Sequence, residues 1–195
     1  MATSTAKASE RYPTESEIQQ MNSELSRSVQ RILSGELRHH LEDYRTEEEK
    51  KSRQVLVEAW SKVNPSIAPF LGMWSGYGQT LSIYPSTTPG RVCVLEGGEG
   101  SFYGFTTGTV LSESEIRTRD RRVIVRSENY LGIVGIYNGK PHFGGEFPFR
   151  NPRPLPVPSQ AMLPTVEDET SGVESAIGQF NKNEAGCTAA LPGAF

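Results

Sequence analysis

The segment YLGIVGIYNGKPHFGGEF, residues 130–147, decides the fold class of this chain. Two runs of β-branched, aromatic and glycine residues flank the dipeptide Asn138-Gly139. A two-residue type I′ hairpin needs positive φ at both central positions, and Asn followed by Gly is the pair that tolerates this best. The segment therefore predicts an antiparallel hairpin with strands over 130–137 and 140–147.

The same short β-branched and aromatic runs, separated by Gly, Pro and Asn, extend back to Phe70. Six or seven strands so closely spaced favour a small antiparallel barrel, because closure removes the exposed edges that an open sheet would leave. The other strands are predicted over 73–84, 91–96, 101–111, 115–119 and 121–127.

A helical segment is predicted before the barrel. Thr14 and Glu17 have the spacing of a capping box, and Thr46 and Glu49 repeat it. Helices are expected from 14 to Gly35, around 36–44, and from 46 to the Asn64-Pro65 stop. The first helix carries an apolar stripe that must be buried against the barrel, the other helices or a second copy of the chain. The stripe consists of Ile18, Met21, Leu25, Val29, Ile32 and Leu33.

The predicted fold class is α+β, divided into four parts. Residues 1–13 are expected to be a disordered N-terminus, 14–65 the helical segment, 66–150 the antiparallel β-barrel and 151–195 a mostly disordered tail. The tail opens with alternating prolines, which favour an extended polyproline II conformation, and continues as an acidic stretch. Its helically spaced apolar residues are interpreted as a docking motif for a partner: Val173, Ile177 and Phe180.

Composition limits the classes of function. The chain has 20 basic and 23 acidic residues, a net charge of -3, which disfavours a nucleic-acid or anionic-membrane binder. It lacks both the roughly 18 apolar residues of a membrane helix and the apolar run of a secretory signal, so a cytoplasmic location is predicted. Only two cysteines occur, and we expect free thiols rather than a disulfide framework or zinc site. No metal or other cofactor is predicted from the three histidines.

Three arginines alternate in the sequence RTRDRR, residues 117–122. In an extended strand Arg117, Arg119 and Arg121 would share one face, because strand side chains alternate. That face would bind phosphates or an acidic protein partner. Nearby carboxylates would equally well neutralise it across strands.

The turn before the first strand ends in Gly72-Met73-Trp74. This Gly-x-Trp resembles the opening signature of lipocalins and related calycin barrels. The resemblance implies that Trp74 closes one end of the barrel beneath a basic residue, for which Arg126 and Lys140 are the candidates. The alternative is that Trp74 only anchors the third helix to the barrel. Residues predicted to line a ligand site are Trp74, Tyr84, Phe105, Arg126 and His142.

Taken together, the sequence predicts a non-catalytic cytoplasmic binding or adaptor protein that uses a small barrel and a flexible tail for protein contacts. Partners are expected at the basic strand, the helix stripe or the tail, and a homodimer through the stripe is one such form. The alternative function is a calycin-like barrel that holds a small hydrophobic or anionic ligand. A small lyase or isomerase that transfers protons through His142, Glu96 or Tyr137 comes third.

Overall fold

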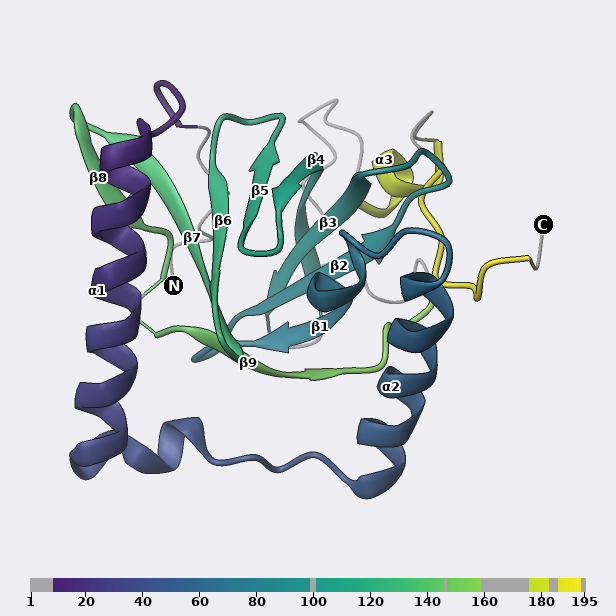
Figure 1. Ribbon diagram of the computed structural model, residues 1–195, viewed down its shortest axis with the longest axis horizontal. Coiled ribbons are helices and arrows are strands. Elements are labelled where there is room, and N and C mark those ends of the chain that lie inside the picture. The colour runs from purple at the N-terminus through teal and green to yellow at the C-terminus, as the bar shows by residue number, and fades with distance from the viewer. Residues whose placement is uncertain (1–8, 99–100, 146, 159–175, 183–185, 194–195) are drawn as a thin grey trace.

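The computed structural model describes residues 9–98, 101–145, 147–158, 176–182 and 186–193 (Figure 1). Helices precede an antiparallel barrel, as the sequence predicts for an α+β fold. The helical elements are α1 (Glu15–Ser34), the 3-10 turn η1 (Glu36–Leu41), α2 (Glu47–Ser61), the 3-10 turn η2 (Ala68–Phe70) and α3 (Ala176–Lys182). The strands are β1 (Gly72–Ser75), β2 (Thr80–Pro85), β3 (Arg91–Gly98), β4 (Ser101–Ser112), β5 (Glu115–Thr118), β6 (Val123–Ser127), β7 (Tyr130–Tyr137), β8 (Lys140–Phe143) and β9 (Phe149–Arg153).

Eight of the strands close into an antiparallel barrel in the order β6-β5-β4-β3-β2-β1-β9-β7, with β7 paired back to β6. Strands β1 to β7 follow one another as a meander. Strand β9 then returns between β7 and β1, where Leu131 pairs with Phe149 and Met73 with Arg153. The ninth strand, β8, pairs only with the far half of β7.

Local signals located the hairpin and two helix starts correctly. Asn138 and Gly139 both have positive φ, 52° and 71°, between β7 and β8. Capping boxes at Thr14 and Thr46 open α1 and α2. The turn and both capping boxes thus form at the residues that the sequence predicts.

The structure has eight barrel strands and a ninth strand, β8, where the sequence predicted six or seven in all. The strand predicted over 140–147 ends at Phe143. Two further strand predictions need correction. The single strand predicted over 73–84 is two strands, because Gly76–Gln79 forms a turn closed by Gly76 N–H donating to the Gln79 carbonyl, 2.8 Å. Strand β9 includes residues 151–153, which the sequence assigned to the tail. Its proline is accommodated because the pairing with β1 shifts register between Met73 and Ser75, at a bulge.

The apolar stripe of α1 packs within the chain, across the outer face of β6 and β7. Ile18, Leu25 and Val29 belong to one buried cluster with Val123 and Val134. Figure 1 shows α1 standing along this side of the barrel. Five of the six stripe residues are buried and therefore have an intrachain partner, which was one of the alternatives left open by the sequence, whereas Leu33 is 45% exposed.

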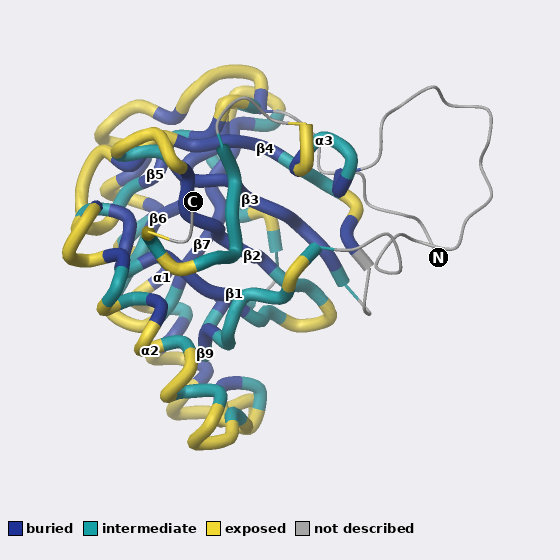
Figure 2. Tube along the Cα trace, turned by 90° about the vertical axis from the view of Figure 1, so that its right-hand side faces the viewer, coloured by how far each residue is buried: buried dark blue, intermediate teal, exposed yellow. Residues whose placement is uncertain are grey.

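Helix α2 and turn η2 cover one end of the barrel. Trp60 from α2 and Phe70 from η2 join the apolar cluster that fills the barrel interior, together with Leu81, Ile124 and Leu131. Figure 2 shows that the trace of the barrel is largely buried, whereas most of α2 and of the connection before it is exposed. We call the end of the barrel that α2 and η2 cover the α2 end.

The described C-terminal segments pack on the outer face of β2 to β4. Ile177 and Phe180 of α3 are buried there against Tyr84 and Leu95. Cys187 forms a disulfide with Cys93 of β3, which corrects the prediction of free thiols. Sequence reasoning missed this bond because the two residues are 94 positions apart and only the fold makes them neighbours. Residues 159–175, including Val173, lie outside the described residues.

Residues 9–13, expected to belong to a disordered N-terminus, contact the β5–β6 turn and the β7–β8 turn. Ser9 N–H donates to the Asp120 carbonyl at 3.0 Å, and the Glu10 carboxylate accepts from the backbone N–H groups of Asn138 and Gly139. Residues 1–8 lie outside the described residues.

Candidate anion-binding site

A cavity of about 620 Å³ lies at the α2 end of the barrel, bordered by Trp74 and three arginines. Gly72 of the Gly-x-Trp sequence explains how the elements around this cavity come together. A Cβ at Gly72 would lie 3.0 Å from the Pro152 side chain and 3.3 Å from Arg53 Nε, and φ at Gly72 is +134°, so a side chain is excluded there. The missing side chain lets β9 and α2 approach the start of β1.

Arg53 of α2 is the cation that lies over Trp74. Its Cζ is 5.7 Å from the centroid of the indole ring, a cation–π contact. Arg53 Nε donates to the Leu71 carbonyl at 3.0 Å and Nη2 to the Pro69 carbonyl at 3.3 Å. Trp74 Nε1 donates to the Phe70 carbonyl at 2.7 Å, and the tryptophan is 2% exposed. Both side chains are thus fixed by the η2–β1 connection.

The connection between η1 and α2 supplies a second arginine. Arg45 Nε and Nη2 each donate to Asp43 at 2.8 Å, a bidentate ion pair, and Nη1 donates to the Pro152 carbonyl at 3.0 Å. The hydrogen bonds from Arg45 hold the pKa of Asp43 well below its usual value. Asn151 Nδ2 donates to the Glu42 carbonyl at 2.9 Å, which ties the same connection to β9.

Arg126, near the end of β6, is the third arginine of the cavity. Its Nη1 donates to the Glu113 carbonyl at 3.2 Å, while its buried Nε has no acceptor among the described residues. Such a buried donor without a partner costs free energy comparable to a lost hydrogen bond. Asn129 of the β6–β7 turn and Tyr130 at the start of β7 complete this side of the cavity.

The electrostatics of the cavity are positive. Burial, and then the positive charges of Arg45 and Arg126, lower the pKa of Arg53 to about 10. Of the described residues that line the cavity, Asp43 is the only one with a carboxylate, and Arg45 occupies both of its oxygens. Within the described part of the chain, neither Arg53 nor Arg126 has a carboxylate within 4.0 Å. The arrangement suits an anion.

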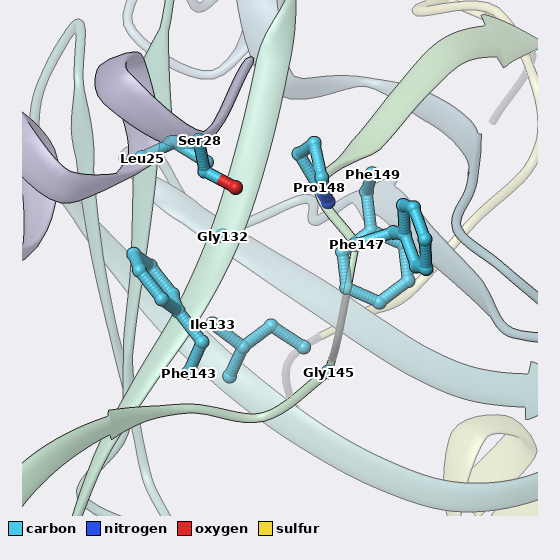
Figure 3. Close-up of a pocket in the computed structure, with 9 residues that line it drawn as sticks. All are labelled: Leu25, Ser28, Gly132, Ile133, Phe143, Gly145, Phe147, Pro148 and Phe149. Atoms are coloured by element: carbon cyan, nitrogen blue, oxygen red, sulfur yellow. The ribbon is translucent and has the colours of Figure 1, made fainter. Parts of the chain in front are cut away.

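Two further cavities lie among the described residues. The cavity in Figure 3 lies between α1, β7 and the segment that leads into β9, and Ser28 is the only residue with a polar side chain among its nine described lining residues. At about 30 Å³ it holds little more than a water molecule. A third cavity, of about 390 Å³, lies between α3 and the β5–β6 turn, where Arg119 and Lys182 are accompanied by Asp120. The cavity in Figure 3 is small and has no basic residue among its described lining residues, and in the cavity beside α3 the two basic residues are accompanied by a carboxylate.

The barrel interior also holds a buried ion pair, away from the α2 end. Arg122, 5% exposed, donates to both carboxylate oxygens of Glu96 and to Asp120. Although burial by itself lowers the pKa of Arg122, the hydrogen bond and charge of Glu96, joined by Asp120, raise it above its usual value. These groups satisfy one another, so the pair serves to fill the barrel and does not need an external ligand.

The structure brings together two of the five residues predicted to line a ligand site. Trp74 and Arg126 border the same cavity, but Arg53 and not Arg126 or Lys140 lies over the indole ring. Tyr84 is fully buried on the outer face of β2, where its hydroxyl donates to the Pro156 carbonyl at 2.9 Å. Phe105 borders the cavity beside α3. His142 is exposed on β8.

The residues predicted to contact partners are largely engaged within the chain. β5 ends at Thr118, so the three arginines do not form one row on a strand. Arg117 pairs with Glu15 and Glu115, Arg121 Nη1 donates to the Glu10 carbonyl at 2.9 Å, and Arg119 borders the cavity beside α3. Ile177 and Phe180 of α3 are buried against the outer face of the barrel.

Sequence reasoning missed Arg45 and Arg53. Arg53 precedes the buried Leu56 and Trp60 by three and seven positions, so it lies on the apolar face of α2. A basic residue on an otherwise apolar face was a signal that its head group meets a buried partner. Arg45 carries no such pattern, since it lies in an irregular connection between two helices.

No family model, curated protein or solved structure matches this chain. Among the described residues, no helix is long and apolar enough to span a membrane. No group of three or more His, Cys, Asp or Glu side chains suited to a metal ion occurs within the described ranges.

Proposed function

We propose that this protein is a non-catalytic binding protein that takes a small organic anion in the cavity at the α2 end of the barrel. The observation that carries this proposal is the pair of guanidinium groups, Arg53 and Arg126, that border one cavity without a carboxylate partner among the described residues. Guanidinium groups bind carboxylates and phosphates with paired N–H donors, which gives both affinity and orientation.

The size of the cavity supports the same function. About 620 Å³ falls within the range of roughly 300–1,000 Å³ that is usual for small-molecule sites. By contrast, apolar side chains from α2, η2 and the strands fill the barrel interior at this end. The proposal therefore keeps the anionic form of the predicted ligand and leaves out a hydrophobic ligand held inside the barrel.

The adaptor function that the sequence favoured is the second candidate. The α1 stripe and the residues Ile177 and Phe180 are packed against the chain's own barrel, so they are not free surfaces in this conformation. What supports a protein contact is a surface aromatic cluster in which Tyr77, 63% exposed, contacts the rings of Phe147 and His40. Substituting Tyr77→Ala should weaken a partner contact without changing anion binding.

A cytoplasmic location stays a prediction from the sequence. The Cys93–Cys187 disulfide is a feature typical of oxidising compartments and weighs against it. Labelling of free thiols in protein taken from its own cells distinguishes the two, since a cytoplasmic protein should react at both cysteines after unfolding.

Anion binding is tested by following the tryptophan fluorescence of the full chain during titration with phenyl phosphate. Trp74 borders the cavity, so a bound anion beside Arg53 should change its emission with saturation at one ligand per chain. Arg126→Gln should weaken binding at least tenfold, whereas Arg38→Gln, which removes an exposed arginine of η1, should not. Failure to saturate, or equal affinity in wild type and Arg126→Gln, would reject the proposal.

A further inference from the structure

The cationic groups of the cavity differ in how fully their charge is matched. The charge of Arg45 is neutralised by its bidentate pair with Asp43. Among the described residues, Arg53 and Arg126 donate hydrogen bonds to backbone carbonyls, and Arg53 also lies over the indole of Trp74. Neither the carbonyls nor the indole carries a net charge. Two positive charges of the site are therefore left without a counter-charge among the described residues.

These two charges act on each other. Arg53 and Arg126 border the same cavity, and the positive charge of Arg126 is among the causes that lower the pKa of Arg53. A ligand with one negative charge would leave one of them unmatched in a partly buried place. A ligand with two negative charges would neutralise both.

The donors that remain available also fit such a head group. A guanidinium has five N–H donors. Two nitrogens of Arg53 and one of Arg126 donate to carbonyls, and the buried Nε of Arg126 has no acceptor among the described residues. The unused donors of both arginines match the several acceptor oxygens of a phosphate monoester or a dicarboxylate.

Apolar side chains also line the cavity. Val57 of α2 and Pro69 of η2 are partly exposed there, whereas Trp74 and Ala68, each 2% exposed, are almost completely covered. A free inorganic ion would leave Val57 and Pro69 in contact with water, whereas an organic group attached to the anion would cover them. The site thus offers guanidinium groups to a head group and apolar side chains to a carbon skeleton.

We propose that the ligand is an organic dianion, a phosphate monoester or a dicarboxylate, whose two charges are matched by Arg53 and Arg126 and whose carbon skeleton lies against Val57 and Pro69. This inference rests on the proposed function and adds the charge class of the ligand. It requires the site to distinguish a dianion from a monoanion of nearly the same shape.

Isothermal titration calorimetry of the full chain at pH 7.5 makes this comparison. Phenyl phosphate is a dianion there, because the second pKa of a phosphate monoester is about 6, while methyl phenyl phosphate carries one charge. Glutarate and its monomethyl ester form the second pair, which separates phosphate from dicarboxylate as the preferred head group. We expect the better dianion to bind at least tenfold more tightly than its monoanionic ester.

The variants separate failure of this inference from failure of the proposed function. In Arg126→Gln the preference for the dianion should shrink to about onefold, because one unmatched charge remains at Arg53. In Arg38→Gln the preference should be unchanged. Binding of dianion and ester with equal affinity by the wild type would overturn the inference while leaving anion binding intact, and absence of binding by all four compounds would overturn both.

Discussion

The Cys93–Cys187 disulfide should contribute a large part of the stability of this fold. It links β3 to the segment after α3 and closes a loop of 94 residues. The chain-entropy relation for a loop of that size gives about 4.6 kcal/mol at 25 °C. Removal of a native disulfide typically costs about 2–5 kcal/mol. A chain of this size loses roughly 2–4 °C in Tm per kcal/mol, so the expected drop is about 5–20 °C.

Cys187→Ala is the variant that isolates this contribution. Cys93 is 0% exposed, so its freed thiol stays in the apolar cluster under α3 and behaves as a small hydrophobic group. The segment that holds Cys187 is also bound to β2 through Thr188 N–H and the Pro85 carbonyl, 3.1 Å, and to α2 through Trp60 Nε1 and the Ala190 carbonyl, 3.1 Å. These weaker contacts should loosen once the disulfide is absent.

Thermal unfolding followed by circular dichroism, with and without a reducing agent, is the assay. Wild type under reducing conditions should unfold at the temperature of Cys187→Ala, and the reducing agent should have no further effect on the variant. If reduction of the wild type lowers Tm by less than about 1 °C, the reasoning about the loop is refuted. Mass spectrometry of alkylated, unfolded protein checks that the bond is present before the experiment.

Three further predictions concern the packing and electrostatics of the fold. Arg122→Met should destabilise the fold by about 3–5 kcal/mol in urea unfolding because it leaves Glu96 buried without its partner, and adding Glu96→Leu should restore much of the loss; equal losses in both variants would contradict this. Leu25→Ala should cost about 2–5 kcal/mol in the same assay because Leu25 packs α1 on the barrel, and a cost below 1 kcal/mol would show that the contact is dispensable. The hydrogen bond from Arg11 lowers the pKa of Glu17 from 4.5 to about 2, so its stabilising effect is present above about pH 4.5 and is lost as pH falls through 2. Glu17→Gln should therefore be less stable than wild type at pH 7, with a difference that narrows toward pH 2; a gap that is constant with pH would argue against the ion pair.

Features set by neighbouring residues could be predicted from the sequence. The Asn138-Gly139 turn, the two capping boxes and the apolar stripe of α1 each depend on residues within a few positions of one another. The barrel followed from the spacing of strands and the need to close sheet edges. Strand β9 could not be recognised, because its pairing with β1 depends on residues about 80 positions away and its prolines resemble those of a linker.

The candidate site was predictable only in part for the same reason. Trp74 and Arg126 were identified from a motif and from their charge, yet nothing local indicates that they share a cavity. Arg53 reaches that cavity because α2 crosses the end of the barrel, and Arg45 because its connection is tied to β9. Tertiary arrangement, and not sequence spacing, brings the three guanidinium groups together.

The central claim is that Arg53 and Arg126 hold one anion at the α2 end of the barrel. A crystal structure of the full chain with phenyl phosphate tests it most directly. The phosphate should lie within hydrogen-bond distance of both guanidinium groups, with the phenyl ring against Val57 and Pro69. A phosphate bound elsewhere, or a carboxylate of the chain itself seated between the two arginines, would contradict the claim.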